Sequence, residues 1–407
     1  MKIMVQKFGG TSVADLACMR RVLDKVRVPL GQGFKVVAVL SARAGETNRL
    51  LALADEWSPA PDPAECDALI STGEQVSTAL FAMLLKDAGI KARSVLAFQA
   101  GILTNAEYGK ARIASIDQAA LRAMFQEHDV LVAAGFQGVS PSGRISTLGR
   151  GGSDTSAVAI AAALKAEMCE IYTDVEGVFT ADPNIVSGAR KLERINYDEM
   201  LEMASMGAKV LEIRSVEFAR KYSVPVHVRS TFTDAPGTLL IKEDKKMENA
   251  LLSGVTQDKD QARITLRACP DRPGVSAGIF GPLAEAGITV DMIVQNPSRD
   301  GVTDVTFTVS RKDLKKALAE VEKLRARMEG MEVLHDAGVC KVSLVGVGMR
   351  NHSGIAAKAF EALAGENINI LMISTSEIKI SCLIEEKYIE LAVRALHDAF
   401  ELGHVQR

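Results

Sequence analysis

The chain has 407 residues, of which 47% are hydrophobic and 24% are charged, and its formal net charge is −3. This length suits two or three domains, and the composition is that of a globular protein. The slightly negative charge, with acidic residues between the lysines and arginines, argues against a nucleic-acid-binding protein and against binding to a membrane surface.

The chain is expected to be cytoplasmic. Residues 1–10 have the pattern of a strand that enters a glycine loop, not that of a signal peptide. No uninterrupted apolar run reaches the roughly 18 residues of a membrane span. The six cysteines lie far apart without metal-type spacing, which indicates buried thiols in a reducing compartment.

Residues 1–230 alternate short apolar runs with longer amphipathic stretches. Strands are predicted over residues 3–7, 35–41, 92–96, 130–134, 170–173 and 225–228, and helices over residues 67–87 and 153–166. Strands that alternate with helices predict an open, mainly parallel sheet covered on both faces, which is a three-layer αβα domain. Since ligands bind at the carboxyl ends of parallel strands, the functional site is expected in the loops that follow them.

A polar stretch over residues 232–246 predicts a domain boundary, and a repeat follows it. Arg263-Ile-Thr-Leu and Lys341-Val-Ser-Leu are alternating strands, and each is followed by a turn, a helix and a second strand. The copies lie about 80 residues apart, which is too long for a solenoid repeat and predicts two small α+β domains of the ferredoxin-like βαββαβ type. The expected organisation is a large domain over 1–230, a linker with the start of the regulatory region over 231–262, and repeats over 263–335 and 341–407.

The first glycine loop, Lys7-Phe-Gly-Gly-Thr-Ser, follows the first predicted strand. Its two glycines allow backbone N–H groups to approach an anion, and the start of the next helix favours phosphate. The lysine precedes the glycines, so this is not the common phosphate-binding loop in which the lysine follows them. Taken alone, the pattern is equally compatible with a plain tight turn.

The second glycine loop, Thr147-Leu-Gly-Arg-Gly-Gly-Ser-Asp, precedes another predicted helix. Arg150 stands among glycines where packing does not require it, and a guanidinium recognises a carboxylate or phosphate through two parallel hydrogen bonds. The alternative is a solvated loop arginine. Two anion-binding loops in one α/β domain are what phosphoryl transfer requires.

Three further segments combine hydroxyl, acidic and glycine residues. They are Ser41-Ala-Arg-Ala-Gly-Glu-Thr, Thr72-Gly-Glu-Gln and Tyr172-Thr-Asp-Val-Glu-Gly-Val-Phe-Thr-Ala-Asp-Pro. In the last of them, Thr173, Asp174 and Asp182 are candidates for holding a ribose or a metal-bound nucleotide. Turns made by the aspartate side chains explain such a loop equally well.

Taken together and in this order, with Gly207-Ala-Lys-Val-Leu after them, these motifs resemble the aspartate kinase (aspartokinase) branch of the amino-acid kinase superfamily. The repeats resemble the tandem ACT domains of the same enzymes, through Asp271-Arg-Pro-Gly, Val290-Asp-Met-Ile-Val-Gln and Ile373-Ser-Thr-Ser-Glu-Ile. The resemblance covers nearly the whole chain. It implies transfer of the γ-phosphoryl group of ATP to the β-carboxylate of L-aspartate, giving 4-phospho-L-aspartate in the first step of lysine, threonine and methionine biosynthesis.

The resemblance also implies a role for each matched residue. Lys7 is expected at the phosphates, Arg150 on the α-carboxylate of aspartate, and Asp154 as the organiser of Lys7; these three form the catalytic group. The expected aspartate-binding residues are Thr47, Glu74, Arg150, Gly151, Gly152 and Ser153. The expected ATP-binding residues are Lys7, Phe8, Gly9, Gly10, Ser41, Thr173, Asp174, Phe179, Thr180, Asp182, Pro183 and Lys209. ATP is expected with Mg²⁺ that the nucleotide mainly carries, and no residue is assigned to a metal.

Feedback inhibition by lysine, threonine or both is implied for the ACT-like repeats. The candidate allosteric residues are Asp271, Ile288, Thr289, Val290, Gln295, Ile355, Asn369, Ile370, Ser376 and Glu377. The expected partners are further copies of the chain, joined through the repeats, or a shorter regulatory chain that starts near Met247.

Two alternatives stay open at this point. Another amino-acid or carbamate kinase of the superfamily shares the glycine loops, but the pairing of Glu74 with Arg150 and the two ACT-like repeats favour aspartate. A catalytically silent amino-acid sensor would need only the repeats, and the intact Lys7, Arg150 and Asp154 argue against it.

Overall fold

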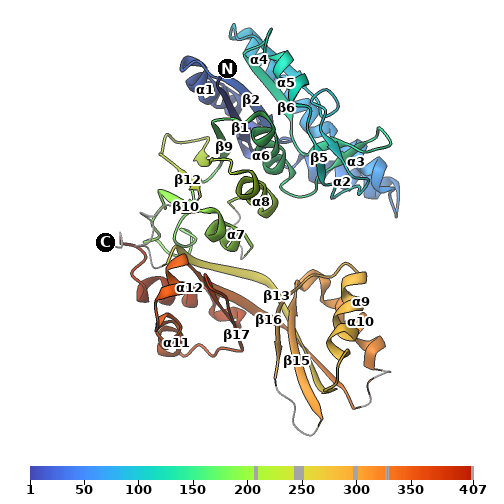
Figure 1. Ribbon diagram of the computed structural model, residues 1–407, viewed down its shortest axis with the longest axis vertical. Helices are drawn as coiled ribbons and strands as arrows, with labels where there is room; N and C mark the ends of the chain where they lie inside the picture. Colours follow the sequence, from blue (N-terminus) through green and yellow to red (C-terminus); the bar gives the residue numbers. More distant parts are fainter. Residues whose placement is uncertain (206–209, 243–251, 297–300, 326–327, 329, 405–407) are drawn as a thin grey trace. The chain divides into compact units, whose positions relative to one another are not determined.

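The computed structural model describes residues 1–205, 210–242, 252–296, 301–325, 328 and 330–404. The packing contacts divide the chain into two compact units (Figure 1). The first unit comprises Met1–Phe179 and Lys191–Met247, and the second comprises Thr180–Arg190 and Glu248–Arg407. Both repeats therefore lie in one unit, which also takes in a short segment from the N-terminal half of the chain.

The first unit contains an eight-stranded sheet in the order β10-β12-β11-β9-β1-β2-β6-β3. Its strands are β1 (Ile3–Phe8), β2 (Lys35–Leu40), β3 (Ala92–Val95), β6 (Val130–Ala134), β9 (Met168–Thr173), β10 (Arg194–Asn196), β11 (Val226–Ser230) and β12 (Thr238–Ile241). Every neighbouring pair is parallel except β11 with β12. The expected mainly parallel sheet is confirmed, and all six predicted strands are present.

One prediction about this sheet is wrong. Strand β12 lies within the stretch that was expected to be a linker, and it pairs with both β10 and β11. Its Leu240 side chain is fully buried. The strand was missed because it is a short apolar run between polar residues, and a linker can have the same composition.

Helices cover both faces of the sheet and form the three expected layers. One face packs against α1 (Leu16–Gly31) and α4 (Thr72–Asp87), whose side chains share a core with β1, β2 and β6. Helix α6 (Gly152–Leu164) contacts β1, β2 and β9, and α8 (Ile213–Tyr222) packs on α6 (Figure 1). The remaining helices are α2 (Glu46–Trp57), α3 (Pro63–Ile70), α5 (Gln118–Met124), α7 (Tyr197–Ser205) and the short 3₁₀ helix η1 (Gly10–Val13).

The single helix predicted over residues 67–87 is divided by a turn at Ser71 into α3 and α4. The stretch Pro63–Asp87 is long and apolar enough, by composition alone, to cross a membrane. Half of its apolar window is buried inside the protein. Because the acidic side chains of Asp67 and Glu74 are buried within it as well, this is a core helix pair.

A second, smaller sheet in the first unit has the order β5-β4-β7-β8 and was not predicted. Its strands are β4 (Leu103–Thr104), β5 (Ile113–Ser115), β7 (Gln137–Val139) and β8 (Ile145–Thr147). They are too short to show a hydrophobic period. This sheet matters for function because β8 leads directly into the second glycine loop.

The second unit is built on one six-stranded antiparallel sheet in the order β14-β15-β13-β16-β18-β17. Its strands are β13 (Gly254–Pro270), β14 (Val290–Gln295), β15 (Val302–Val309), β16 (Glu332–Val345), β17 (Met372–Thr375) and β18 (Lys379–Glu385). Its helices are α9 (Val275–Glu285), α10 (Leu314–Arg325), α11 (Ile355–Gly365) and α12 (Ile389–Ala399).

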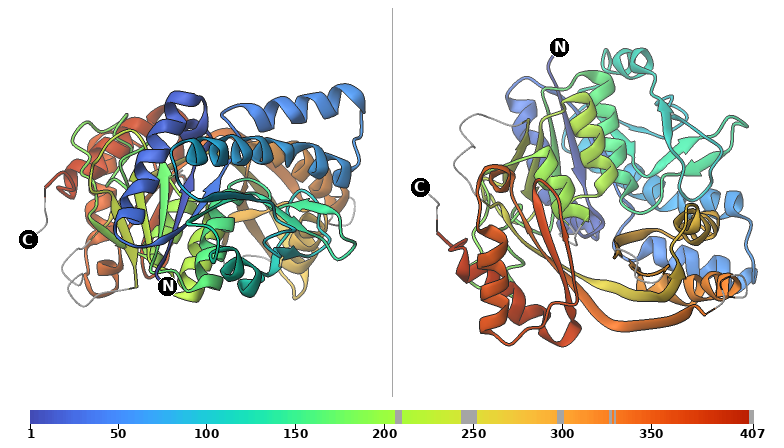
Figure 2. Two further views of the ribbon diagram at one scale, coloured as in Figure 1. Left: turned by 90° about the horizontal axis from the view of Figure 1, so that it is seen from above. Right: turned by 60° about the horizontal axis from the view of Figure 1, so that its bottom comes forward.

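The two long strands β13 and β16 run side by side through both halves of this unit (Figure 2). The first part of β13 pairs with the last part of β16, from Gly254 opposite Val345, while Arg267 near its other end lies opposite Glu332. Each long strand therefore serves both repeats. This explains why β13 begins before residue 263, where the first repeat was expected to start.

Each repeat has its own core. Side chains of α9, α10 and β15 form the first core, and those of α11, α12 and β18 form the second. The second core also includes Ala181 and Val186 from the segment Thr180–Arg190. The predicted pair of βαββαβ domains is confirmed.

Candidate active site

The centre of the site is an ion pair between the two glycine loops. Lys7 lies at the end of β1, and Asp154 lies in the first turn of α6. Their Nζ and Oδ1 atoms are 2.6 Å apart, and the side chains are only 12% and 11% exposed. The pair brings the two glycine loops together, and the role of Asp154 as the organiser of Lys7 stays a prediction.

The turn after β1 packs closely against the turn after β2. A Cβ atom at Gly10 would lie 2.9 Å from the carbonyl oxygen of Ala42, so only glycine fits without a shift of the backbone. The hydroxyl of Ser12 bonds to the hydroxyl of Thr231 at 2.7 Å. Phe8 is fully buried and stacks on Tyr172 with ring centroids 4.8 Å apart. Only the backbone of Phe8 is therefore available to a ligand.

Glu74 is a buried acid on α4, only 3% exposed. Its Oε1 accepts a hydrogen bond from the backbone N–H of Ala42 at 2.9 Å. Its Oε2 has no hydrogen-bond partner in the described part of the chain. Burial raises the pKa of Glu74 to about 7. A buried carboxylate oxygen without a partner suits a cationic group of a ligand.

The second glycine loop has two left-handed residues, Gly149 at φ 81° and Gly151 at φ 68°. A Cβ at Gly151 would lie 2.1 Å from Cγ of Glu212. A side chain is therefore excluded at this position both by the clash with Glu212 and by the left-handed backbone conformation. Between these glycines Arg150 is exposed, and its guanidinium has no hydrogen-bond or ion-pair partner among the residues that the structure describes. The loop therefore presents a free cation to solvent.

The first turn of α6, which carries Ser153, lies close to the end of β6. Ser153 is 7% exposed, and a Cβ at Gly135 would lie 2.8 Å from its Oγ. The backbone N–H of Gly135 donates to the carbonyl of Leu40, at the end of β2, at 3.0 Å. Thr47, in the first turn of α2, is half-buried. The structure thus gathers Lys7, Gly9, Gly10, Ser41, Glu74, Ser153 and Asp154 at the carboxyl edge of the sheet.

The predicted nucleotide loop is divided between the two units. Thr173 ends β9, and its hydroxyl donates to Asp174 at 3.0 Å. Phe179 belongs to the first unit, whereas Thr180, Asp182 and Pro183 belong to the second. Lys209 lies outside the described residues. The assignment of these residues to ATP stays a prediction.

Two side chains of this loop already have partners within the second unit. The Thr180 hydroxyl lies 3.0 Å from Nε2 of His397 and accepts from the backbone N–H of Arg190 at 2.9 Å. Asp182 accepts from the backbone and side-chain amides of Asn184. The turn formed by the Asp182 side chain matches the alternative interpretation of this loop.

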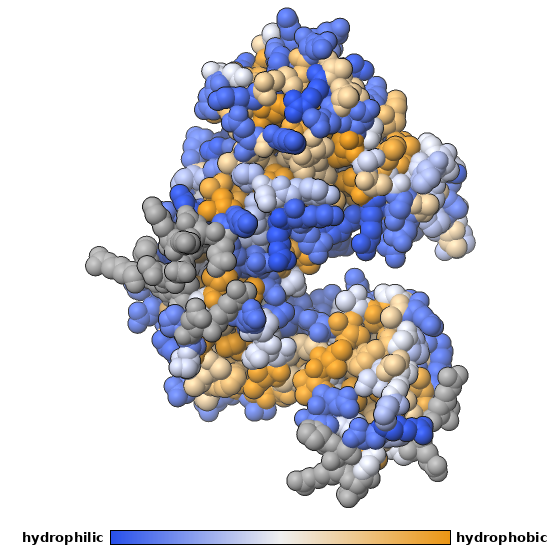
Figure 3. Space-filling model, viewed as in Figure 1, coloured by the Kyte–Doolittle hydropathy of each residue, from blue (hydrophilic) through white to orange (hydrophobic). Residues whose placement is uncertain are grey.

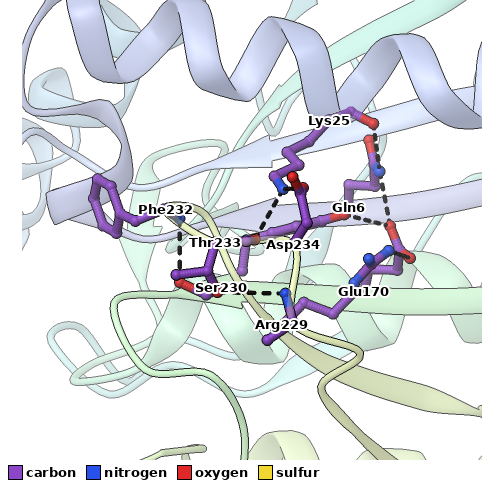
Figure 4. Close-up of polar contacts among 10 residues, drawn as sticks. Gln6, Lys25, Glu170, Arg229, Ser230, Phe232, Thr233 and Asp234 are labelled. Carbon is purple, nitrogen blue, oxygen red and sulfur yellow. Dashed lines mark hydrogen bonds and ion pairs between the residues drawn. The ribbon is translucent and has the colours of Figure 1, made fainter.

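A buried polar network supports β1, β9 and β11 beside the site (Figure 4). Glu170 accepts hydrogen bonds from Gln6 at 2.8 Å, from Tyr172 at 3.1 Å and from Arg229 at 3.1 Å. At the exposed end of this network, Lys25 on α1 bonds to the solvent-exposed carboxylate of Asp234 at 2.6 Å (Figure 4). Since Tyr172 stacks on Phe8, this network fixes the strand that carries Lys7.

Sequence reasoning missed the residues that support the site from behind. Besides Glu170, they include Asp67 on α3 and Arg214 on α8, which bond to backbone groups beside the second glycine loop. The only signal for Asp67 was a single acid within an apolar helical stretch. Nothing in the sequence distinguished Arg214 from a surface arginine.

The turns that precede α9 and α11, next to the candidate effector residues, have the same conformation in the two repeats. Gly274 and Gly354 precede α9 and α11 with φ angles of 93° and 94°. Ile288 and Ile355 are buried in the two cores, and Gln295 accepts from the hydroxyl of Ser276 at 3.2 Å. The side chains of Asp271, Thr289, Asn369, Ser376 and Glu377 are exposed. Their role in effector binding stays a prediction.

Among the described residues, no group of three or more His, Cys, Asp or Glu side chains is arranged to hold a metal ion. The six cysteines are free thiols. A protein cage for a divalent cation is therefore not formed by that part of the chain.

Comparison with known proteins adds the following. The chain matches the amino acid kinase family over residues 2–230 and the ACT domain over residues 264–326 and 342–400. It is 53% identical to an aspartate kinase of Stutzerimonas stutzeri over 403 residues, which cover 99% of this chain and 98% of that protein.

Solved structures give the same result. The crystal structure of E. coli aspartokinase III in complex with aspartate and ADP (R-state) has a TM-score of 0.82 and 30% identity, covering 98% of this chain and 99% of that chain. The same enzyme in complex with lysine and aspartate (T-state) has a TM-score of 0.75 and 30% identity, covering 98% and 100%.

Proposed function

The chain belongs to the aspartate kinases of the amino acid kinase family, and we propose that the residues at the carboxyl edge of its large sheet divide the work of the reaction. In that reaction the γ-phosphoryl group of ATP is transferred to the β-carboxylate of L-aspartate, giving 4-phospho-L-aspartate and ADP. The observation that supports this proposal best is the shielded Lys7–Asp154 pair between two glycine loops.

Aspartate is held at its two invariant charges. The unpartnered Oε2 of Glu74 accepts from the α-ammonium group, and the free guanidinium of Arg150 binds the α-carboxylate through two hydrogen bonds. Thr47 and Ser153 orient the β-carboxylate, and Gly151 and Gly152 leave the backbone close to the substrate. Holding the substrate by its α-ammonium and α-carboxylate groups contributes much of the rate enhancement, because the β-carboxylate is then aligned with the phosphoryl group before the reaction.

The transfer itself needs alignment and charge neutralisation. A β-carboxylate has a reference pKa near 3.9, so it is already ionised at neutral pH and needs no general base. One of its oxygens forms the new bond to the γ-phosphorus, while the bond between that phosphorus and the β–γ bridging oxygen breaks and ADP leaves with the electron pair. Lys7 stabilises the negative charge on the transferring group, and Asp154 keeps its ammonium in position.

ATP is bound beside Lys7 by the turn after β1 and by the ends of β2 and β9. Gly9 and Gly10 supply backbone N–H groups, with Ser41, Thr173 and Asp174 beside them. Phe8, Phe179, Thr180, Asp182, Pro183 and Lys209 complete the proposed set by their match to the family motif. Mg²⁺, carried by the phosphates, adds neutralisation of the phosphate charge.

The ACT domains are proposed to bind lysine, threonine or both and to inhibit the kinase. They are also proposed to join copies of the chain. The edge strands β14 and β17 carry Ile293 and Ile373, which are 53% and 43% exposed and equivalent in the two repeats. Figure 3 shows apolar side chains gathered on the visible face of the second unit. Exposed apolar edge strands favour pairing with another sheet.

A shorter regulatory chain starting near Met247 remains a further proposal, and Met247 lies outside the described residues. A soluble, cytoplasmic enzyme is proposed from the buried position of the helix pair α3 and α4 and from the free thiols.

The proposed reaction is tested with the purified full chain, MgATP and hydroxylamine, which traps an acyl phosphate as its hydroxamate. L-Aspartate should give hydroxamate, whereas L-glutamate and N-acetyl-L-glutamate should give at most a small fraction of that rate. A comparable rate with either glutamate compound, or no hydroxamate with aspartate, would contradict the proposal.

A further inference from the structure

Asp67 and Arg214 hold the same two backbone segments of the first unit, residues 109–111 and 147–148. Neither side chain belongs to the site described above. The two segments are joined to each other by the backbone N–H of Ala111, which donates to the carbonyl of Thr147 at 2.8 Å. Residues 147–148 lead directly into the turn that carries Arg150, and residues 109–111 lie beside them.

Asp67 binds the N–H side of these segments. Its carboxylate is 1% exposed and accepts from the backbone N–H of Gly109 at 2.9 Å, the backbone N–H of Thr147 at 2.7 Å and the Thr147 hydroxyl at 2.7 Å. A buried carboxylate with several donors is rigidly fixed, because any movement leaves one of them unsatisfied.

Arg214 binds the carbonyl side. Its Nη1 donates to the carbonyl of Leu148 at 2.5 Å, and its Nη2 donates to the carbonyl of Ala111 at 2.9 Å. The planar guanidinium fork fixes the distance between these two carbonyls, which a lysine ammonium cannot do in the same way.

The two contacts meet at the start of the arginine-bearing turn. Gly149 follows Leu148 directly, and a Cβ on it would lie 3.0 Å from the carbonyl oxygen of Gly109. The turn therefore rests on the segment that Asp67 and Arg214 hold. Arg150, the next residue, has no described contact of its own, so its direction depends on the backbone beneath it.

We propose that Asp67 and Arg214 are positioning residues for aspartate binding, which act by holding the turn that presents Arg150 to the α-carboxylate. This inference rests on the proposed role of Arg150. A merely structural role for the same two residues would lower stability without selecting one substrate. A positioning role changes the Michaelis constant for aspartate and leaves that for ATP unchanged.

The test is steady-state kinetics of the full chain with Arg214→Gln, Arg214→Lys and Asp67→Asn, each alone and in an Arg150→Ala background. Arg214→Gln should raise KM for aspartate roughly tenfold with KM for ATP unchanged, because small displacements of a clamp cost this much or more. The KM of Arg214→Lys for aspartate should lie between those of Arg214→Gln and the parent. In the Arg150→Ala background, Arg214→Gln should raise KM for aspartate by less than about twofold, because the effects of two residues that act through one contact are not additive.

Arg144 and Glu65 provide the matched control. They form an ion pair of 2.6 Å that also links the β7–β8 hairpin to α3, but both side chains are exposed. Arg144→Gln and Glu65→Gln should leave both Michaelis constants unchanged. If Asp67→Asn does not fold, the two Arg214 variants decide the question.

Two results would overturn the proposal while leaving the role of Arg150 intact. One is an unchanged KM for aspartate in Arg214→Gln when Arg150→Ala raises it. The other is an equal rise on Arg214→Gln in both backgrounds. If Arg150→Ala itself leaves KM for aspartate unchanged, the proposed function of Arg150 is wrong, and the inference built on it is wrong with it.

Discussion

Lys7 at the end of β1 and Asp154 at the start of α6 place their charged atoms 2.6 Å apart in a region that is largely shielded from water. Shielding strengthens the attraction between the two charges and fixes the ammonium in one direction. The ammonium group of Lys7 is therefore held in one place by Asp154, and in the proposed mechanism Asp154 acts on the reaction only through Lys7.

The first prediction concerns Asp154→Asn. The variant keeps the shape of the side chain but loses the charge that orients Lys7, so kcat should fall by roughly tenfold to a hundredfold with little change in either Michaelis constant. If Asp154 were a general base, the kcat of the parent would depend on the ionisation of this carboxyl, and the pH profile of Asp154→Asn would lack that step. Asp24→Asn, which removes an exposed ion pair with Arg27, is the control and should have no effect.

The second prediction concerns the pH dependence of aspartate binding. Burial raises the pKa of Glu74 to about 7, so this carboxyl is neutral below that pH in the free enzyme. A neutral carboxyl cannot pair with the α-ammonium of aspartate. We expect kcat/KM for aspartate to fall as the pH drops through about 7, and Glu74→Gln to show a low value without this step. A parent profile that stays flat from pH 6 to pH 8 would be incompatible with this role.

The third prediction follows from the same burial and concerns stability. The pKa of Glu74 is raised from 4.5 to about 7 in the folded protein, so between these values the folded chain binds a proton that the unfolded chain does not. Its contribution to stability is therefore present at low pH and is lost as the pH rises through about 7. Glu74→Gln should have a higher Tm than the parent at pH 8 and a similar Tm at pH 4.5. Thermal unfolding at both values checks this, and an equal difference at the two would count against it.

The fourth prediction concerns feedback inhibition. Asp271→Ala and Ser376→Ala change exposed residues in the turns of the two repeats, away from both protein cores. Activity without effector should be unchanged, and the concentration of lysine or threonine that halves the activity should rise by several-fold, within the typical coupling energy of 1–3 kcal/mol. Unchanged inhibition curves in both variants, with catalysis intact, would place the effector site elsewhere.

The sequence predicted the parts of the fold that have strong local signals. The buried strands of the large sheet, such as Val130–Ala134, are continuous apolar runs. The glycine loops indicate places where the backbone approaches other atoms closely, as it does at Gly10 and Gly151. These patterns were enough to predict that Lys7 and Asp154 lie at one edge of the sheet, because the carboxyl ends of parallel strands share that edge.

What the sequence did not predict depends on partners far along the chain. The short strands β4, β5, β7 and β8 have no period of their own, and β12 was hidden by polar neighbours. The segment Thr180–Arg190 joins the second unit because Ala181 and Val186 pack in the core of the second repeat. Asp67 and Arg214 bond to backbone groups, which carry no residue-specific signal.

In the proposed mechanism Lys7 acts on the transferring phosphoryl group, whereas Arg150 binds the substrate. Steady-state kinetics of Lys7→Ala and Arg150→Ala, measured together with both substrates varied, tests this most directly. Lys7→Ala should lower kcat by about a hundredfold or more, because it removes a contact made in the transition state. Arg150→Ala should chiefly raise KM for aspartate and leave KM for ATP nearly unchanged. Near-parental turnover in Lys7→Ala, or the same pattern of kinetic constants in both variants, would contradict the claim.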